Sequence, residues 1–229
     1  MITVHHLENS RSQRVLWLLD ELALPYQVTR YQRDEKTMLG PPELRAVHAL
    51  GKSPVITDGD TTLAETGAIV EYLLERHGQG RLRPAEHSEA LLRYRYWLHF
   101  AEGSAMPPLL MALVFDRVAN GPMPFFVRPV ARAIAGRVMD LLVRPNLTSQ
   151  FDFMEAELQR YPWFAGADFS AADIMMSFPL EAAARHAGLD ESRPAMMKFL
   201  DRIHARPAYQ KALKRGGPYD FVKPLTLAR

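Results

Sequence analysis

The fold of this chain is decided by one stretch, His48-Ala49-Leu50-Gly51-Lys52-Ser53-Pro54-Val55-Ile56, which is followed after an acidic turn by Leu63-Ala64-Glu65-Thr66. Pro54 opens a β-branched run, so Ser53 is expected in an extended conformation with its backbone unpaired at a strand edge. Glu65 and Thr66 precede an apolar-periodic run, which predicts a helix N-terminus with free backbone N–H groups. A peptide-like ligand carrying an ammonium and a carboxylate group would fit such a site.

The elements around this stretch predict an α/β domain. We expect strands at residues 2–6, 26–31, 55–56 and 61–64, and helices at 15–22, 41–47 and 66–77. A strand-helix-strand start followed by a hairpin and a helix is typical of the thioredoxin-like arrangement, a mixed sheet with helices on both faces.

The remainder of the chain predicts an all-helical domain. Gly78, Gly80 and Pro84 break the periodicity, and no strand pattern returns afterwards, so we expect domains at residues 1–80 and 88–229. The apolar spacing predicts helices at 88–106, 108–118, 124–142, 146–160, 170–187 and 194–205. Ser170 and Asp173 are predicted to form a capping box, with Asp173 in a structural role.

The composition restricts the class of protein. The 229 residues are 48% hydrophobic, enough for two cores, and no apolar run reaches the roughly 18 residues of a membrane span. Because such a run and a basic, apolar leader are both lacking, we expect no membrane partner and a cytoplasmic location. The net charge is only +2, with Lys and Arg spread among carboxylates, so we expect no nucleic-acid partner. The chain contains no cysteine, which excludes disulfides and any protein thiol nucleophile. The spacing of the histidines does not suggest a metal site.

The stretch from Gly51 to Ile56, the hairpin, and the Leu-Ala-Glu-Thr helix start together resemble the glutathione-binding half of a glutathione S-transferase. The resemblance implies that Ser53 pairs through its backbone with the cysteinyl part of glutathione and that Pro54 is cis. It also implies that Glu65 and Thr66 hold the γ-glutamyl end. Lys52 either pairs with the glycyl carboxylate or is a solvated loop charge. Cysteine-dependent, thiol-transferring relatives are excluded by the composition.

The catalytic element is expected between the first strand and the first helix, where Ser10, Arg11, Ser12 and Arg14 lie. A hydroxyl at a helix N-terminus can donate a hydrogen bond to a thiolate whose charge the helix dipole also favours. In serine-type transferases the catalytic serine stands four residues before a helix arginine, which implies Ser10. Ser12 is the competitor, and either serine can instead cap the helix. Arg11 either faces the ligand carboxylates or is solvated, and Arg14 is expected to brace the domain interface.

A proline-containing segment of the helical domain is the candidate electrophile pocket. We expect Pro107 and Pro108 to break the helix and leave apolar side chains facing the first domain. The Gly- and Pro-rich residues 119–129 are expected to form a loop that can act as a lid. The pocket residues predicted in this way are Met106, Leu109, Leu110 and Phe115.

Segments of this chain resemble those of a bacterial and fungal subgroup of the glutathione S-transferases, and this resemblance leads to one functional prediction. The chain is expected to activate the thiol of glutathione as a co-substrate for attack on an apolar electrophile, without a metal, and to form a homodimer. Two alternatives stay open: a glutathione-dependent peroxidase, and a binding or regulatory protein of the same fold without turnover.

Overall fold

A computed structural model of the chain describes residues 1–34 and 36–222. Its N-terminal part holds a four-stranded mixed sheet in the order β2-β1-β3-β4. β1 is parallel to β2 and antiparallel to β3, which is antiparallel to β4. The strands are β1 (Ile2–Leu7), β2 (Tyr26–Tyr31), β3 (Val55–Asp58) and β4 (Thr61–Ala64). The predicted mixed sheet is confirmed.

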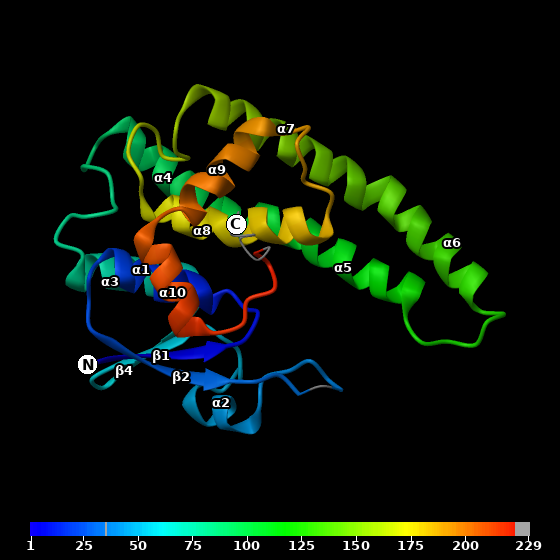
Figure 1. Cartoon of the computed structure of the whole chain (residues 1–229), viewed down its shortest axis with the longest axis horizontal. Coiled ribbons are helices and arrows are strands. Elements are labelled where there is room, and N and C mark those ends of the chain that lie inside the picture. The colour runs from blue at the N-terminus through cyan, green and yellow to red at the C-terminus, as the bar shows by residue number, and fades with distance from the viewer. Residues whose placement is uncertain (35, 223–229) are drawn as a thin grey trace, which may run out of the picture.

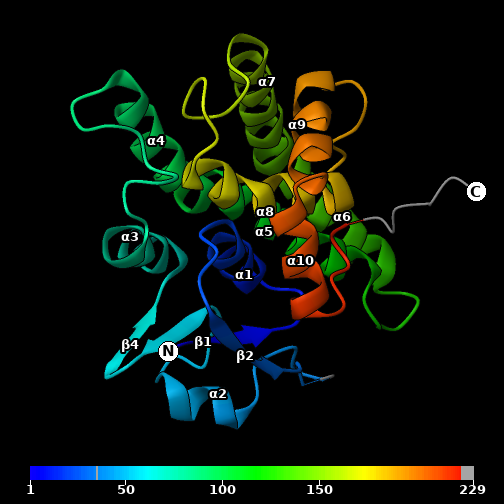
Figure 2. The same cartoon turned by 60° about the vertical axis from the view of Figure 1, so that its left-hand side comes forward.

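Three helices cover the two faces of this sheet. Figure 2 shows α1 (Ser12–Glu21) and α3 (Thr66–His77) between the sheet and the helical part, and α2 (Pro42–Val47) on the opposite side. Helix α1 is buried nearly all round, because the sheet lies on one side of it and α8 and α10 on the other. Trp17 of α1 is fully buried and meets the ring of Tyr209 edge-on at 5.1 Å. The two parts of the chain therefore share packing around α1.

The helical part begins after residues 78–88, which form neither helix nor strand (Figure 1). Its elements are α4 (Glu89–Phe100), η1 (Ala101–Ala105, a π-helical segment), α5 (Met106–Asn120), α6 (Arg128–Val138), η2 (Met139–Val143, also π-helical), α7 (Arg144–Arg160), α8 (Ala171–His186), α9 (Pro194–His204) and α10 (Pro207–Gly216). The predicted class, a thioredoxin-like domain followed by an all-α domain, is confirmed.

The predicted helix break at Pro107 and Pro108 is wrong. The chain is helical without interruption from Glu89 to Asn120, and the prolines stand in the first turn of α5 directly after η1. A π-helical turn shifts the hydrogen-bond register by one residue, so it can accommodate the missing N–H groups of proline. The break predicted between residues 142 and 146 is wrong for the same reason, since η2 precedes Pro145 within one helix from Arg128 to Arg160.

Helices α5 and α6 project together from the body of the protein, and the loop of residues 121–127 lies at their far end (Figure 1). The loop that was expected to act as a lid is thus shorter than predicted and lies away from the sheet. Within the described residues, one helix, Glu89–Asn120, has the length and apolar composition of a membrane-spanning helix, and 44% of its most apolar 18 residues are buried inside the protein.

The capping box at the start of α8 is confirmed. The Ser170 N–H donates to Oδ2 of Asp173 at 2.8 Å, and the Phe164 N–H donates to Oδ1 of the same carboxylate at 2.8 Å. Burial raises the pKa of Asp173 to about 6, against its hydrogen bonds, which favour the charged form. Asp173 therefore ties the turn before α8 to the helix itself, which is a structural role.

Candidate functional site

The sheet register brings three separate segments to one edge. β1 ends at Leu7, and β3 begins opposite it, with Val55 paired to His5. β4 ends at Ala64, which pairs with Val55, and Glu65 follows. The β1–α1 loop, the Ser53–Pro54 turn and the start of α3 therefore meet at the same edge. This is the arrangement that the sequence predicted for a binding site.

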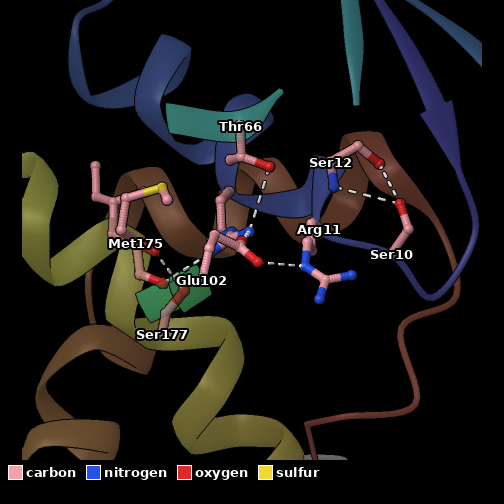
Figure 3. A network of polar contacts seen from close by, with 9 residues as sticks. Ser10, Arg11, Ser12, Thr66, Glu102, Met175 and Ser177 are labelled. Carbon is pink, nitrogen blue, oxygen red and sulfur yellow. Dashed lines mark hydrogen bonds and ion pairs between the residues drawn. The ribbon is translucent and has the colours of Figure 1, made fainter. Parts of the chain in front are cut away.

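The β1–α1 loop holds a short chain of polar side chains. The Ser10 and Ser12 hydroxyl oxygens are 2.7 Å apart (Figure 3). The Ser12 hydroxyl oxygen is also 2.8 Å from Nδ1 of His6. The backbone N–H of Ser12 also donates to the Ser10 hydroxyl at 3.3 Å. Ser12 is fully buried and Ser10 nearly so, at 6% exposure. Of the two serines, Ser10 therefore lies on the outer side.

His6 anchors the inner end of this chain as a neutral ring. Burial, and then the charge of Arg30, lowers the pKa of His6 to about 4. A neutral imidazole has one donor and one acceptor nitrogen, so it can hold the Ser12 hydroxyl without adding charge beside Ser10. His6 was not among the residues predicted for the site, because its strand position indicated only that it and His5 face opposite ways.

Ser53 meets β1 through its side chain. Its hydroxyl donates to the His5 carbonyl at 2.8 Å and accepts the Leu7 N–H at 3.1 Å. The Ser53–Pro54 peptide is cis, as the resemblance implied. Within residues 1–34 and 36–222, neither the N–H nor the C=O of Ser53 takes part in a hydrogen bond. The Ser53 backbone is thus available to a ligand, while its side chain is not. Lys52 is exposed next to it.

Glu65 has an unusual backbone conformation at the start of α3. Its φ is 67° and its ψ is 120°, and its side chain is exposed. A non-glycine residue in such a conformation stores about 1–3 kcal/mol of strain, and strain of this kind is concentrated at functional sites. The next residue, Thr66, is buried, and its hydroxyl accepts a hydrogen bond from Nη2 of Arg14 at 3.4 Å. The fold therefore keeps Glu65 in a strained backbone conformation at the start of α3, next to the proposed binding edge.

A buried ion-pair network lies beside this edge (Figure 3). Arg14, whose side chain is 1% exposed, pairs with Glu102 of η1 and donates to the Met175 carbonyl of α8 at 2.8 Å. Arg11 pairs with the other oxygen of Glu102 at 3.0 Å. Burial alone would raise the pKa of Glu102, but Arg14 and Arg11 hold that pKa below its ordinary value. Arg14 therefore connects α1 to the helical part, the role expected for it.

Sequence reasoning missed Glu102. A signal was present, since Glu102 is the one acidic residue in the apolar stretch from Trp97 to Phe115. A lone carboxylate in such a stretch indicates a buried cationic partner, because an unpaired buried charge is strongly unfavourable.

The four residues predicted for the electrophile pocket do not share one wall. Met106 and Leu109 are buried in the core, whereas Leu110 is 54% exposed. Phe115 lines a cavity of about 570 Å³ within the helical part, together with Met139 and Phe151. The helical part instead approaches the β1–α1 loop through Phe178, whose ring centroid is 5.4 Å from the Arg11 guanidinium carbon.

The C-terminal segment also approaches the β1–α1 loop. The side-chain amide of Asn9 donates through Nδ2 to the Asp220 carboxylate at 2.8 Å, and its Oδ1 accepts the Asp220 backbone N–H at 2.8 Å. Phe221 packs on Phe178 with ring centroids 5.0 Å apart. An apolar pair of rings thus lies close to the loop that carries Ser10.

Two family models match this chain. Residues 4–81 match the glutathione S-transferase N-terminal domain, and residues 124–207 match the glutathione S-transferase C-terminal domain. The chain is 35% identical over 217 residues to glutathione S-transferase 1 of Saccharomyces cerevisiae, covering 91% of this chain and 92% of that protein.

This chain belongs to the glutathione S-transferase family.

Other relatives agree with that assignment. Glutathione S-transferase 3 of Schizosaccharomyces pombe is 33% identical over 216 residues, covering 94% of this chain and 88% of that protein. The crystal structure of a glutathione S-transferase from Actinobacillus pleuropneumoniae superposes with a TM-score of 0.76 at 34% identity, covering 96% and 95% of the two chains. The chain is therefore a transferase that uses glutathione as co-substrate.

Proposed function

We propose that this transferase binds glutathione along the edge where the β1–α1 loop, Ser53 and the start of α3 meet, and that Ser10 stabilises the thiolate. The observation that carries the proposal is the register of β1, β3 and β4, which brings these three segments together. The Ser53 backbone would pair with the cysteinyl part of the ligand. Glu65 would accept the γ-glutamyl ammonium, and the N-terminus of α3 with Thr66 would receive the γ-glutamyl carboxylate.

Ser10, rather than Ser12, is assigned to the sulfur. Ser12 is fully buried and in contact with His6, so its hydroxyl is a support for Ser10. Ser10 precedes the first turn of α1, where the helix dipole also favours a negative charge. Arg11, held through its Nε by Glu102, and the exposed Lys52 are the cations that we assign to the ligand's carboxylates.

Thiol ionisation supplies only a small part of the rate. Lowering a thiol pKa from about 8.5 to about 6.5 raises the thiolate fraction at neutral pH about 25-fold. The less basic thiolate is about 8-fold less nucleophilic at a Brønsted slope near 0.45, which leaves a net gain of about 3-fold. Holding the thiolate and the electrophile together must therefore contribute most of the acceleration.

The electrophile is assigned to the apolar rings next to the β1–α1 loop, Phe178 and Phe221. These two rings replace the wall of Met106, Leu109, Leu110 and Phe115 that the sequence predicted, because those four side chains lie in different environments. Phe178 is itself buried, and it supports the partly exposed ring of Phe221, which would meet the electrophile. An apolar electrophile between these rings and Ser10 would lie beside the thiolate. Phe178→Ala is expected to raise the KM for an apolar electrophile more than the KM for glutathione.

The protein is also proposed to act as a homodimer. The family resemblance implies that the N-terminal part of one subunit packs on the helical part of the other about a two-fold axis. Tyr96 of α4 and Phe153 of α7 are exposed apolar side chains on the helical part, with ring centroids 6.1 Å apart, and they would be covered by such a partner. Light scattering at micromolar concentration should report twice the chain mass of 26.0 kDa, and a monomer alone would contradict it.

One experiment tests the proposed function. Wild-type protein and the Ser10→Ala variant are applied to glutathione-agarose and then assayed with chlorodinitrobenzene. The expected result is retention of both proteins, with turnover at neutral pH strongly reduced in the variant. Retention of the wild type without turnover would favour a binding protein instead. Equal turnover of the two proteins would remove Ser10 from the mechanism.

A further inference from the structure

The end of the α5–α6 hairpin exposes apolar side chains to solvent. This hairpin tip consists of Val118 in the last turn of α5, Phe125, Phe126 and Val127 in the loop, and Val130 in the first turn of α6. Phe125 is 80% exposed and Phe126 is 67% exposed, and their rings meet edge-on at 5.7 Å. Exposed aromatic side chains gathered at a projecting end mark a site of interaction.

The hairpin that carries this tip is strongly basic. Residues 110–138 contain four arginines and one acidic residue, Asp116, which gives a net charge of +3, whereas the whole chain carries only +2. All other residues together are therefore close to neutral, at −1. The Asp116 carboxylate accepts a hydrogen bond from the Asn120 amide at 2.9 Å, and Arg117 and Arg128 flank the tip as exposed side chains. The hairpin thus carries a local excess of positive charge beside its apolar tip.

The shape of the tip fits a flat partner. Figures 1 and 2 both show the loop at the outer end of the two helices, beyond the body of the protein. Gly121, Pro122 and Pro124 limit the helices and restrict the loop backbone. A convex end with aromatic side chains at its apex and arginines behind them can enter the interface of a lipid layer.

We propose that the hairpin tip docks this protein on a membrane surface that carries anionic lipid headgroups. Phe125 and Phe126 enter the interface, and Arg117 and Arg128 face the headgroups. The expectation of no membrane partner rested on the lack of a spanning run, and an interfacial contact needs no span. If the proposed function holds, the docked enzyme would meet apolar electrophiles where they partition.

A second copy of this chain fits the tip less well. Two tips packed on each other would bring their arginines together, and like charges at an interface are unfavourable. The surface around Tyr96 and Phe153, which we assign to the dimer, lies instead at the other ends of the same long helices. Anionic headgroups therefore match both the charge and the apolar character of the tip.

Vesicle sedimentation tests this proposal on the full-length protein. Wild type is expected to sediment with vesicles of phosphatidylcholine and phosphatidylserine, to bind phosphatidylcholine alone much more weakly, and to be released by added salt. The Phe125→Ser/Phe126→Ser double variant should lose at least about tenfold in affinity for the mixed vesicles. The Arg117→Gln/Arg128→Gln double variant should lose about 30-fold.

Two control variants remove exposed apolar side chains or exposed arginines at other places on the surface. Leu39→Ser/Leu50→Ser removes two exposed apolar side chains from the N-terminal part, and Arg95→Gln/Arg185→Gln removes two exposed arginines from α4 and α8. Both control variants should bind vesicles as wild type does. Retention on glutathione-agarose and an unchanged thermal midpoint would show that every variant is folded.

Several outcomes would overturn the proposal. If the wild-type protein binds neither type of vesicle, or binds both types equally well, it has no preference for anionic lipid and the proposal is wrong. Control variants that lose as much affinity as the tip variants would show that the site lies elsewhere. If the tip variants bind vesicles normally but lower the molecular mass in light scattering, a second copy covers the tip instead.

Discussion

The side chains of His6 and Ser12 share a buried hydrogen bond of 2.8 Å directly behind Ser10. Through this bond the neutral imidazole of His6 supports the β1–α1 loop at the start of α1. If His6 were protonated, a charge would be placed in a buried position near the charge of Arg30. The stability of the site loop is therefore linked to pH.

Acid should destabilise the fold through His6. Its pKa is lowered from 6.5 to about 4, so the folded protein binds this proton less readily than the unfolded chain. The stability due to neutral His6 is complete above about pH 6.5 and is lost as the pH falls toward 4. Between pH 7 and 4.5 the free energy of unfolding should fall by about 2–3 kcal/mol through this group. Urea unfolding at the two pH values measures it.

The His6→Asn variant isolates this effect, because other groups titrate in wild type and variant alike. Its loss of stability between the two pH values should be smaller than that of wild type by about 2–3 kcal/mol. His99→Asn, on the exposed face of α4, is the control and should behave as wild type. Equal pH dependence in wild type and His6→Asn would show that His6 does not titrate in this range.

Ser10→Ala should raise the pKa of the glutathione thiol in the complex. A hydrogen bond to a charged acceptor contributes about 1.5–3 kcal/mol, so the expected rise is about one to two units. Ser12→Ala should change the thiol pKa little, because Ser12 lies behind Ser10. The absorbance of bound thiolate as a function of pH gives both values.

The effect of each serine on the thiol pKa must be separated from its effect on the stability of α1. Because either serine can cap the helix, each substitution can destabilise α1 by about 1 kcal/mol. Urea unfolding of the two variants measures that loss independently. A thiol pKa that follows Ser12 would reverse the assignment. A pKa that follows neither serine would leave the backbone N–H groups and the helix dipole to stabilise the thiolate.

Glu65→Ala and Glu65→Gly should separate binding from stability. Both remove the carboxylate, so glutathione affinity measured by calorimetry should fall by about 2–4 kcal/mol in each. Glycine also relieves the strain at φ 67°, whereas alanine retains it. The glycine variant should therefore be about 1 kcal/mol more stable than the alanine variant. Unchanged affinity in both would remove Glu65 from the site.

Glu102→Gln should destabilise the protein, because Arg14 would keep its charge in a buried position without a carboxylate partner. We expect a loss of about 2–3 kcal/mol in the free energy of unfolding, less than for a fully buried pair because Glu102 is partly exposed. Asp140→Asn breaks the exposed pair with Arg144 and is the matched control, with an expected loss below about 0.5 kcal/mol. Similar losses in the two variants would contradict a structural role for Glu102.

The sequence predicted the structure best where the conformation depends on residues that are neighbours along the chain. Pro54 and its β-branched neighbours predicted the strand entry, and the helix predicted at residues 66–77 has the same bounds in the structure. The sequence indicated the mixed sheet through the order of strands and helices. These features depend on backbone restriction and on short-range periodicity, both of which are visible in a single sequence.

Other features depend on packing that a single sequence does not show. Proline was treated as a helix breaker at Pro107 and Pro108, and a second break was predicted between residues 142 and 146, although a π-helical segment keeps the helix continuous at both places. Helix α10 was missed, although Tyr209, Ala212 and Gly216 are spaced to face α1. The support of Ser10 by His6, and of Arg14 by Glu102, joins residues of different elements, so neither was predicted.

The π-helical segment η1 has a consequence for how this chain can change in evolution. A π-helical turn holds one residue more than the α-helical turn it replaces, so deleting one residue from Ala101–Ala105 can restore a regular α-helix while α4 and α5 keep their relative rotation. Glu102 and the projecting α5–α6 hairpin lie on the same helical run. A deletion of one residue in this segment would therefore leave the hairpin tip on the same side of the molecule, whereas the same deletion within α5 would rotate the tip by about 100° about the helix axis.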